Sequence, residues 1–457
     1  MGELTELLAR MRAFYRSGAT RPIAARVAAL RRLKQAIREA EPAIRAAMYG
    51  DFGKCGFDAF ATELLMVYEE IDAAVKGLRR WSRPRRAAPG LVNFPARARV
   101  IPEPLGTALI LSPWNYPFLL AVGPLVGAVA AGNCVVLKPS AKTPRTATEI
   151  SRILGKCFPG EWVSACQGGH DLSDALLAQR FDLIFFTGSA AVGRRVLERA
   201  AQHLTPVILE LGGKSPCIVD ASADPERAAR RIAWGKFTNA GQTCVAPDYV
   251  LAHRSVLQPL VTALCRQVQS RYYDGEGLSP DYPRIITADN YDRLMSYLAA
   301  GRAACGGWGE RESLRIAPTI LIDVKPDSAV MLEEIFGPIL PVLPFDELDE
   351  ALAFVNERPK PLALYAFGED QRVVARILAQ TSSGGGCVND TLMHIAAPSL
   401  PFGGVGESGM GKYHGRYSFD AFSNLRCVLF KGKRELSLRY PPHAPQQVER
   451  MRRLLRQ

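Results

Sequence analysis

A cysteine in a loop of small, uncharged residues is the first feature of this chain that could do chemistry. Residues 238–244 read TNAGQTC, end at Cys244 and follow a predicted helix over residues 228–237. The thiolate is the form of cysteine that attacks an electrophile, and small neighbours leave it an open approach. Free cysteine is also among the most buried residue types, so the loop taken alone is more typical of a packed core thiol.

Glu210 changes that interpretation. It stands between two leucines and is followed by two glycines, which is an unusual setting for an acid in a plain strand. Burial among apolar neighbours raises the pKa of a carboxyl group toward the range that suits a general base. A single acid of this kind is usually an exposed residue at a strand end, but the pair with Cys244 favours a nucleophile and a base.

Asn115 lies in a run, residues 112–118, that follows a predicted strand over residues 108–111. Ligands of open α/β sheets lie beyond the carboxyl ends of the strands, so this run is well placed for a site. The Asn115 amide can donate to a carbonyl oxygen that becomes negative as sulfur attacks, a contribution of roughly 3 kcal/mol. A plain turn is the alternative, and the Cys244–Glu210 pair favours the oxyanion role.

These residues and several glycine-rich runs resemble the aldehyde dehydrogenase superfamily. The resemblance covers about residues 1–440, and the motifs occur in the order found in that family. Residues 413–420, YHGRYSFD, resemble the class 3 branch, which includes fatty and aromatic aldehyde dehydrogenases. The implied fold is α/β, with a Rossmann-like cofactor domain, a second α/β catalytic domain and a small β oligomerisation arm.

The resemblance implies that NAD or NADP is the cofactor. Lys138 is expected at the adenosine ribose and Glu334 at the nicotinamide ribose. Gly188 and Gly193 open a helix whose free N–H groups suit a pyrophosphate, although their spacing differs from the G-x-G-x-x-G fingerprint. The full set of expected cofactor-binding residues is Lys138, Ser140, Gly188, Ser189, Gly193, Leu211, Glu334, Phe336 and Trp114.

Ala141 departs from the family pattern, which usually has a glutamate directly after the serine at 140. That carboxylate would accept a bond from the ribose 2′-hydroxyl and repel a 2′-phosphate. Its replacement by alanine weakens the case for strict NAD preference and leaves room for NADP.

The mechanism that the resemblance implies joins oxidation to hydrolysis. Cys244 adds to an aldehyde, Asn115 and the Cys244 backbone N–H stabilise the oxyanion, and hydride loss leaves a thioester. Glu210 then activates water, and a carboxylic acid departs. Two alternatives are a CoA-acylating aldehyde dehydrogenase, against which Glu210 argues, and a non-catalytic protein of the same fold.

Apolar and aromatic residues near the motifs suggest a medium- or long-chain aliphatic or an aromatic aldehyde as substrate. Core packing would explain each of them equally well. They are Tyr68, Tyr116, Leu120, Trp234, Phe237 and Ile395.

Composition is typical of a globular protein, with 457 residues, 48% of them hydrophobic, and a net charge of +12. Basic runs at 79–86 and 450–456 have no nucleic-acid motif beside them, so a solvated surface is the expectation. No apolar run reaches the roughly 18 residues of a membrane helix. The start of the chain does not read as a secretory signal, and ten cysteines and six histidines form neither paired spacings nor a metal-ligand cluster. We therefore expect a cytoplasmic protein without a metal site.

The elements that must position these residues follow from periodicity. Residues 1–82 predict helices, 84–104 an irregular and then extended stretch, and the chain from 107 onward alternates strands and helices, which favours parallel sheets. We expect the NAD(P)-binding domain to comprise 1–83 and 105–209, and the catalytic domain to comprise 210–400. Residues 84–104 and 401–440 form the arm and C-terminal segment, and the class 3 resemblance implies a homodimer.

Overall fold

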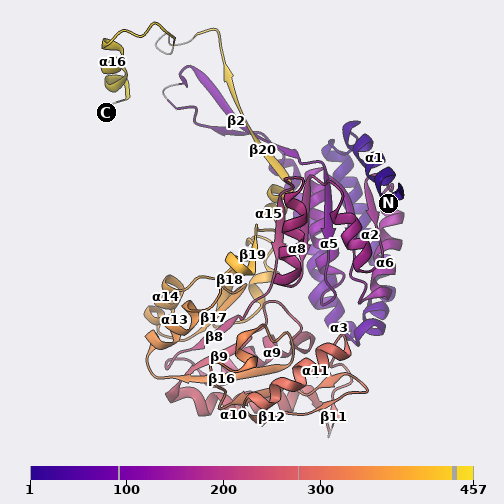
Figure 1. Ribbon diagram of the computed structural model, residues 1–457, viewed down its shortest axis with the longest axis vertical. Helices are drawn as coiled ribbons and strands as arrows, with labels where there is room; N and C mark the ends of the chain where they lie inside the picture. Colours follow the sequence, from indigo (N-terminus) through magenta and orange to yellow (C-terminus); the bar gives the residue numbers. More distant parts are fainter. Residues whose placement is uncertain (1, 91–92, 276, 435–439, 456–457) are drawn as a thin grey trace.

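The structure is a computed structural model that describes residues 2–90, 93–275, 277–434 and 440–455. Two mainly parallel sheets lie one above the other along the long axis of the molecule, and a narrow arm projects beyond the upper one (Figure 1). This arrangement confirms the predicted α/β class. In the described ranges, no helix is both long and apolar enough to cross a bilayer.

The N-terminal region is helical, as its periodicity predicts. Apolar side chains at Leu30, Leu33 and Ile37 are fully buried, and the long second helix ends at Gly53, whose φ of 77° is a conformation that glycine adopts readily. These elements are α1 Gly2–Arg16, α2 Ile23–Phe52, α3 Gly56–Ala59, the π-helical turn η1 Phe60–Leu64 and α4 Leu65–Trp81.

The first sheet has six strands in the order β19-β7-β6-β3-β4-β5, all parallel except β19. Its central strands are buried at every position, as expected for a parallel sheet with helices on both faces. The strands are β3 Thr107–Leu111, β4 Cys134–Lys138, β5 Val163–Ala165, β6 Leu183–Thr187, β7 Val207–Glu210 and β19 Gly409–Met410. The helices that follow them are α5 Leu119–Ala131, α6 Pro144–Cys157, α7 His170–Leu177 and α8 Ala190–Ala201.

The second sheet has seven strands in the order β12-β15-β16-β9-β8-β17-β18, with only β12 antiparallel. Its strands are β8 Pro216–Val219, β9 Tyr249–His253, β12 Arg302–Cys305, β15 Thr319–Ile322, β16 Ile339–Phe345, β17 Ala363–Phe367 and β18 Gly385–Val388. Its helices are α9 Pro225–Phe237, α10 Arg254–Tyr272, α11 Ala288–Ser296, α12 Ala329–Leu332, α13 Leu348–Asn356 and α14 Gln371–Gln380.

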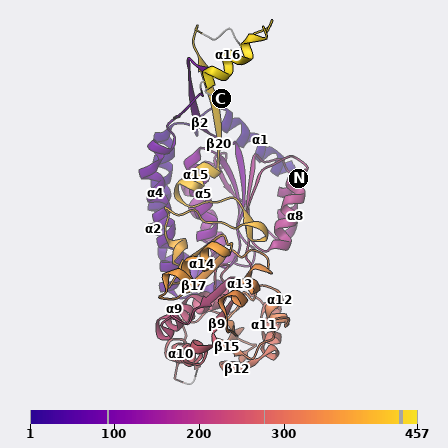
Figure 2. The same ribbon diagram turned by 90° about the vertical axis from the view of Figure 1, so that its left-hand side faces the viewer.

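The arm is a three-stranded antiparallel sheet that stands clear of the body in both views (Figures 1 and 2). It contains β1 Arg85–Ala87, β2 Ala96–Pro104 and β20 Ser423–Lys431, and α16 Gln446–Leu455 lies beyond it. The predicted C-terminal segment, 401–440, contributes to both the body and the arm. β19 pairs with β7 in the first sheet, and α15 Gly415–Ala421 packs against α5 before the chain enters the arm.

Candidate active site

A cavity of about 530 Å³ lies between the two sheets. The carboxyl ends of β3, β6 and β7 open into it, as the switch-point rule for α/β sheets predicts. Ten of the predicted site residues line it: Trp114, Asn115, Leu120, Gly188, Ser189, Glu210, Leu211, Cys244, Glu334 and Phe336.

The loop that carries Cys244 has an unusual backbone. Asn239, Ala240 and Gly241 are consecutive residues with left-handed φ values of 55°, 52° and 72°. A Cβ at Gly241 would overlap the carbonyl group of Gly337, so only glycine fits there. Strained backbone of this kind persists where surrounding contacts hold it and is concentrated at functional sites.

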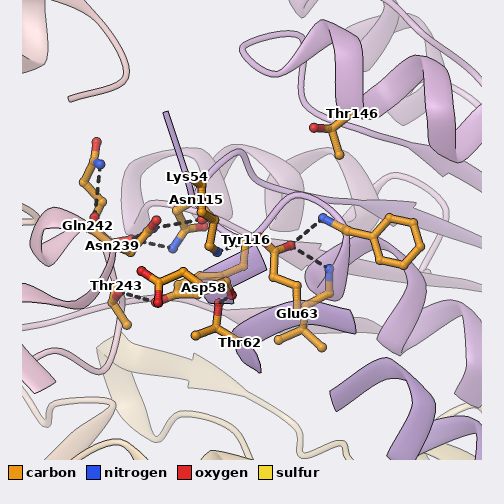
Figure 3. Close-up of polar contacts among 12 residues, drawn as sticks. Lys54, Asp58, Thr62, Glu63, Asn115, Tyr116, Thr146, Asn239, Gln242 and Thr243 are labelled. Atoms are coloured by element: carbon orange, nitrogen blue, oxygen red, sulfur yellow. Dashed lines mark hydrogen bonds and ion pairs between the residues drawn. The ribbon is translucent and has the colours of Figure 1, made fainter. Parts of the chain in front are cut away.

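Side-chain amides tie this loop to the run that contains Asn115 (Figure 3). Asn239 Nδ2 donates to the backbone oxygen of Asn115 at 2.9 Å, and Asn115 Nδ2 donates to the backbone oxygen of Gln242 at 3.0 Å. A side-chain amide has two N–H groups, so the second N–H of Asn115 is available to a ligand in the cavity. The amide is therefore placed to serve a developing oxyanion.

The Cys244 thiol is only partly exposed. Burial raises its pKa above the ordinary value, and the nearby Glu334 and Glu210 carboxylates add to that shift, while backbone N–H groups at 244 and 245 oppose it. Burial therefore disfavours the thiolate, which is the attacking form, and the proton must leave the sulfur before it attacks.

Glu210 is a buried acid that lines the same cavity. It ends β7 and is 2% exposed, and neither of its carboxyl oxygens has a hydrogen-bond partner within the described residues. Burial raises its pKa well above the usual range, and the nearby Lys412 ammonium lowers it by less. A raised pKa makes the ionised form of this carboxyl group a stronger base than an ordinary carboxylate, which suits removal of a proton from water.

Glu334 and Phe336 form the opposite side of the cavity. Burial, together with Asp248, raises the pKa of Glu334 to about 8. A Cβ at Gly212 would overlap its carboxylate, so glycine is needed for this close approach. Phe336 packs edge-on against Trp114 with a centroid separation of 5.4 Å, which joins the two aromatic residues into one apolar wall.

The match to a family model decides the identity of this fold. The model described as the aldehyde dehydrogenase family matches residues 3–428. The chain belongs to this family.

Relatives agree with that identification. The chain is 46% identical to 4,4'-diaponeurosporen-aldehyde dehydrogenase of Staphylococcus aureus, over 94% of this chain and 95% of that protein. It is also 46% identical to aldehyde dehydrogenase family 3 member A2 of Mus musculus, over 96% of this chain and 91% of that protein. A solved structure of Staphylococcus aureus AldH in a substrate-bound state has a TM-score of 0.95, 43% identity and 99% coverage of both chains.

A more distant solved structure is Mycobacterium tuberculosis aldehyde dehydrogenase complexed with NAD+. Its TM-score is 0.85 at 28% identity, covering 94% of this chain and 90% of that chain. This chain is accordingly an NAD(P)-dependent aldehyde dehydrogenase, and the predicted class 3 resemblance is confirmed.

The residues of the cleft fit a dinucleotide. Gly188 and Ser189 place the start of α8 at the cavity, where free helix N–H groups suit a pyrophosphate. Gly193 lies in the first turn of α8, and a Cβ there would crowd Leu211, so its role is close packing.

Lys138 and Ser140 lie at the carboxyl end of β4, next to β3, and are not part of the cavity lining. Burial lowers the pKa of Lys138, and the Ser140 hydroxyl accepts a bond from the Lys142 backbone N–H at 3.2 Å. Ala141, the residue after Ser140, is exposed and presents only a methyl group.

Two predicted substrate residues of this aldehyde dehydrogenase lie outside the cavity lining. Tyr68 faces α2, where its hydroxyl donates to Glu41 at 3.4 Å, and does not reach the cavity. Phe237 is buried in the core, edge-on against Tyr272 at 5.5 Å. Tyr116 lies behind the cavity, with its hydroxyl 2.6 Å from Thr243 Oγ1.

The other three predicted substrate residues lie in three different places. Leu120 lines the main cavity, whereas Trp234 on α9 is 39% exposed. Ile395 lines a second, small cavity that sequence reasoning did not predict, with Met66, Glu69, Glu70, Leu119, Ala396, Pro398 and His414. The consecutive residues 119 and 120 line different cavities, so the first turn of α5 separates the two.

The burial of Glu210 predicts a pH-dependent effect of Glu210→Gln on stability. Above a pH of about 4.3 the unfolded carboxyl group ionises, while the folded one releases its proton only at higher pH because burial raises its pKa, so wild-type stability falls as pH rises toward the folded pKa. The glutamine variant lacks this titration. We expect its Tm to rise relative to wild type between pH 5 and pH 8, measured by differential scanning calorimetry.

The exposed acid Glu407 lines the same cavity and provides a matched control. The Tm difference between Glu407→Gln and wild type should change little over that range. Parallel Tm curves for Glu210→Gln and wild type would contradict the assignment of a desolvated carboxyl group at 210.

Proposed function

We propose that this aldehyde dehydrogenase converts an apolar aldehyde to the carboxylic acid through a thiohemiacetal and then a thioester on Cys244. The observation that carries the proposal is that the partly exposed thiol and the unpaired Glu210 carboxyl group face the same cavity. A CoA-acylating enzyme has no need of a water-activating acid in that position, so Glu210 favours hydrolysis.

Each residue has one task in this sequence. The Cys244 thiol loses its proton to solvent, its sulfur forms a bond to the aldehyde carbon as the carbonyl π bond breaks, and the free N–H of Asn115 donates to the oxygen that becomes negative. NAD+ or NADP+, when bound in the cleft, accepts a hydride. Glu210 then takes a proton from the water that attacks the thioester, and the C–S bond breaks to release the acid and the thiol. Dividing the reaction in this way replaces one difficult step by two easier ones.

Replacing the base separates the two halves of the reaction. Glu210→Gln should give a rapid burst of NAD(P)H close to one equivalent of enzyme, followed by steady-state turnover at least about 100-fold slower than wild type. The burst is followed by stopped-flow absorbance at 340 nm, and mass spectrometry should find an acyl group on Cys244.

Cys244→Ala provides the control for that experiment, because it should bind NAD(P) but give neither burst nor turnover. Acyl-CoA should not form when CoA is added to the wild-type enzyme. Unchanged steady-state turnover of Glu210→Gln would remove Glu210 from the hydrolytic step.

We propose a medium- or long-chain aliphatic or an aromatic aldehyde as the substrate class. Leu120 and the wall formed by Trp114 and Phe336 give the main cavity apolar surfaces, and Leu119, Met66 and Ile395 do the same for the second cavity. The relative from Staphylococcus aureus is named for a 4,4'-diaponeurosporen-aldehyde. In a panel of aldehydes, kcat/KM should be higher for decanal and benzaldehyde than for a small charged aldehyde such as succinic semialdehyde.

We propose that the enzyme accepts NADP+ as well as NAD+, because Ala141 carries no charge that would repel a 2′-phosphate. Ala141→Glu should lower kcat/KM for NADP+ relative to NAD+ by at least about tenfold, or about 1.4 kcal/mol. Ala141→Gln has nearly the same size without the charge and should change the ratio little. An unaltered ratio in Ala141→Glu would place the 2′-position of the cofactor elsewhere.

We propose a homodimer in which the arm of one subunit docks on the second sheet of the other. β20 and β18 are end strands of their sheets, and each presents an open edge in the described chain. A groove of about 360 Å³ lies at β18, and β20 exposes Leu425, Leu429 and Phe430. Open edges and exposed apolar side chains are features that natural proteins cover by pairing.

The combined substitution Leu429→Lys and Phe430→Lys should convert the dimer to a monomer, measured by sedimentation velocity. Leu204→Lys alters an exposed leucine outside the arm and should leave the dimer intact. A dimer that survives the arm substitutions would contradict this interface.

A further inference from the structure

A fully buried ion pair lies behind the oxyanion loop, residues 112–118, outside the cavity. Lys54 Nζ is 2.6 Å from Glu63 Oε1, and the side chains are 1% and 0% exposed (Figure 3). Removing two charges from water costs several kcal/mol per ion, and a buried pair often adds no net stability over apolar residues of the same size. Fold stability alone therefore does not explain this pair.

Glu63 uses its second oxygen to hold the start of α5. Glu63 Oε2 accepts hydrogen bonds from the backbone N–H groups of Phe118 at 2.8 Å and Leu119 at 3.1 Å. The N-cap residue of α5 is Phe118, whose own side chain has no acceptor for these groups. Glu63 lies in the π-helical turn η1, a rare conformation that is frequent at functional sites.

Lys54 contacts Tyr116, which, like Asn115, joins the oxyanion loop to the loop of Cys244. Its ammonium group lies 4.1 Å from the centroid of the Tyr116 ring, in the range of a cation–π contact. The Tyr116 hydroxyl bonds to the side chain of Thr243, the residue before Cys244. The pair therefore holds both Tyr116 and the peptide groups two residues further on.

Asn115 lies between these anchors and the nucleophile. Its side chain and backbone are bonded to Gln242 and Asn239 on the cysteine side, and the residues that follow it are held by Glu63 and Lys54 on the far side. Donors that are already in place when charge develops cost no reorganisation during the reaction. A shift of this loop would move the free N–H of Asn115 away from the oxyanion position.

We propose that Lys54 and Glu63 are positioning residues that hold Asn115 and Tyr116 against the Cys244 loop, so that the oxyanion donor is fixed before substrate arrives. The inference rests on the proposed role of Asn115 and Cys244. It assigns a function to the N-terminal helical layer, which contributes no residue to the lining of the main cavity.

The test is the double variant Lys54→Met with Glu63→Gln, in which both buried charges are removed together. Its Tm should stay close to that of wild type. The hydride-transfer rate constant in a single turnover at saturating aldehyde should fall roughly 100-fold, the loss that a misplacement of about 1 Å causes. The dissociation constant of NAD+ should remain unchanged, so the effect appears in kcat and not in cofactor binding.

A second comparison distinguishes positioning from general weakening of the fold. If the pair acts through Asn115, adding Lys54→Met and Glu63→Gln to Asn115→Ala should slow hydride transfer no further than Asn115→Ala alone. Additive losses, or an unchanged rate constant in the double variant, would overturn the proposal. If the double variant does not fold, Tyr116→Phe replaces it in the comparison with Asn115→Ala. Additive losses in the hydride-transfer rate constant would then also overturn the proposal.

The half-exposed ion pair of Lys34 with Asp72, at 2.5 Å between α2 and α4, is the matched control. Lys34→Met with Asp72→Asn should leave hydride transfer at the wild-type rate. The single variant Asn115→Ala distinguishes the two failures. If Asn115 is not the oxyanion donor, this variant transfers hydride at the wild-type rate, whatever the double variant does.

Discussion

The site depends on keeping the Glu210 carboxyl group out of water without giving it a hydrogen-bond partner. Burying a polar group that has no hydrogen bond costs free energy, and Glu210 has no partner at either oxygen within the described chain. The same isolation raises the pKa of both Glu210 and Cys244. A partner that stabilised the carboxylate would lower its pKa and remove its usefulness as a base.

The N-terminal helices contribute more than a cover for the first sheet. Asp51 accepts from the backbone of Thr146 at the start of α6 at 2.9 Å, and Glu70 accepts from the backbone of Gly415 at the start of α15, also at 2.9 Å. Glu63 does the same for α5. Carboxylates at helix N-termini satisfy free N–H groups and interact favourably with the helix dipole.

Two of these helices are preceded by residues that reach the site. The loop before α5 carries Asn115, and the chain before α15 carries Lys412, which lowers the pKa of Glu210. The loop before α6 carries Ser140, a predicted cofactor-binding residue outside the cavity lining. Asp51, Glu63 and Glu70 therefore hold the first turns of α6, α5 and α15, and each of these turns fixes the end of the loop before it. In this way the N-terminal helices, which do not line the main cavity, help to position the loops that do.

The amino-acid sequence by itself determined the chemical parts and the fold class. Each of Cys244, Glu210 and Asn115 taken alone also fits a structural role, and they are recognisable as a catalytic set through their combination and the resemblance to the aldehyde dehydrogenase family. The alternation of strands and helices after residue 107 is local, since side-chain periodicity follows from backbone geometry. These predictions agree with the observed sheets and with the lining of the cavity.

Only the tertiary structure decided which side chains of each helix face a cavity and which face a neighbouring helix. Periodicity places Met66 and Tyr68 on one helix, but contacts with α2 take Tyr68 away from the site while Met66 lines the second cavity. No local pattern in the sequence singles out Lys54 or Glu63, which the fold buries next to Tyr116. Burial, hydrogen bonding and pKa depend on residues far apart in the chain, so local sequence patterns do not determine them.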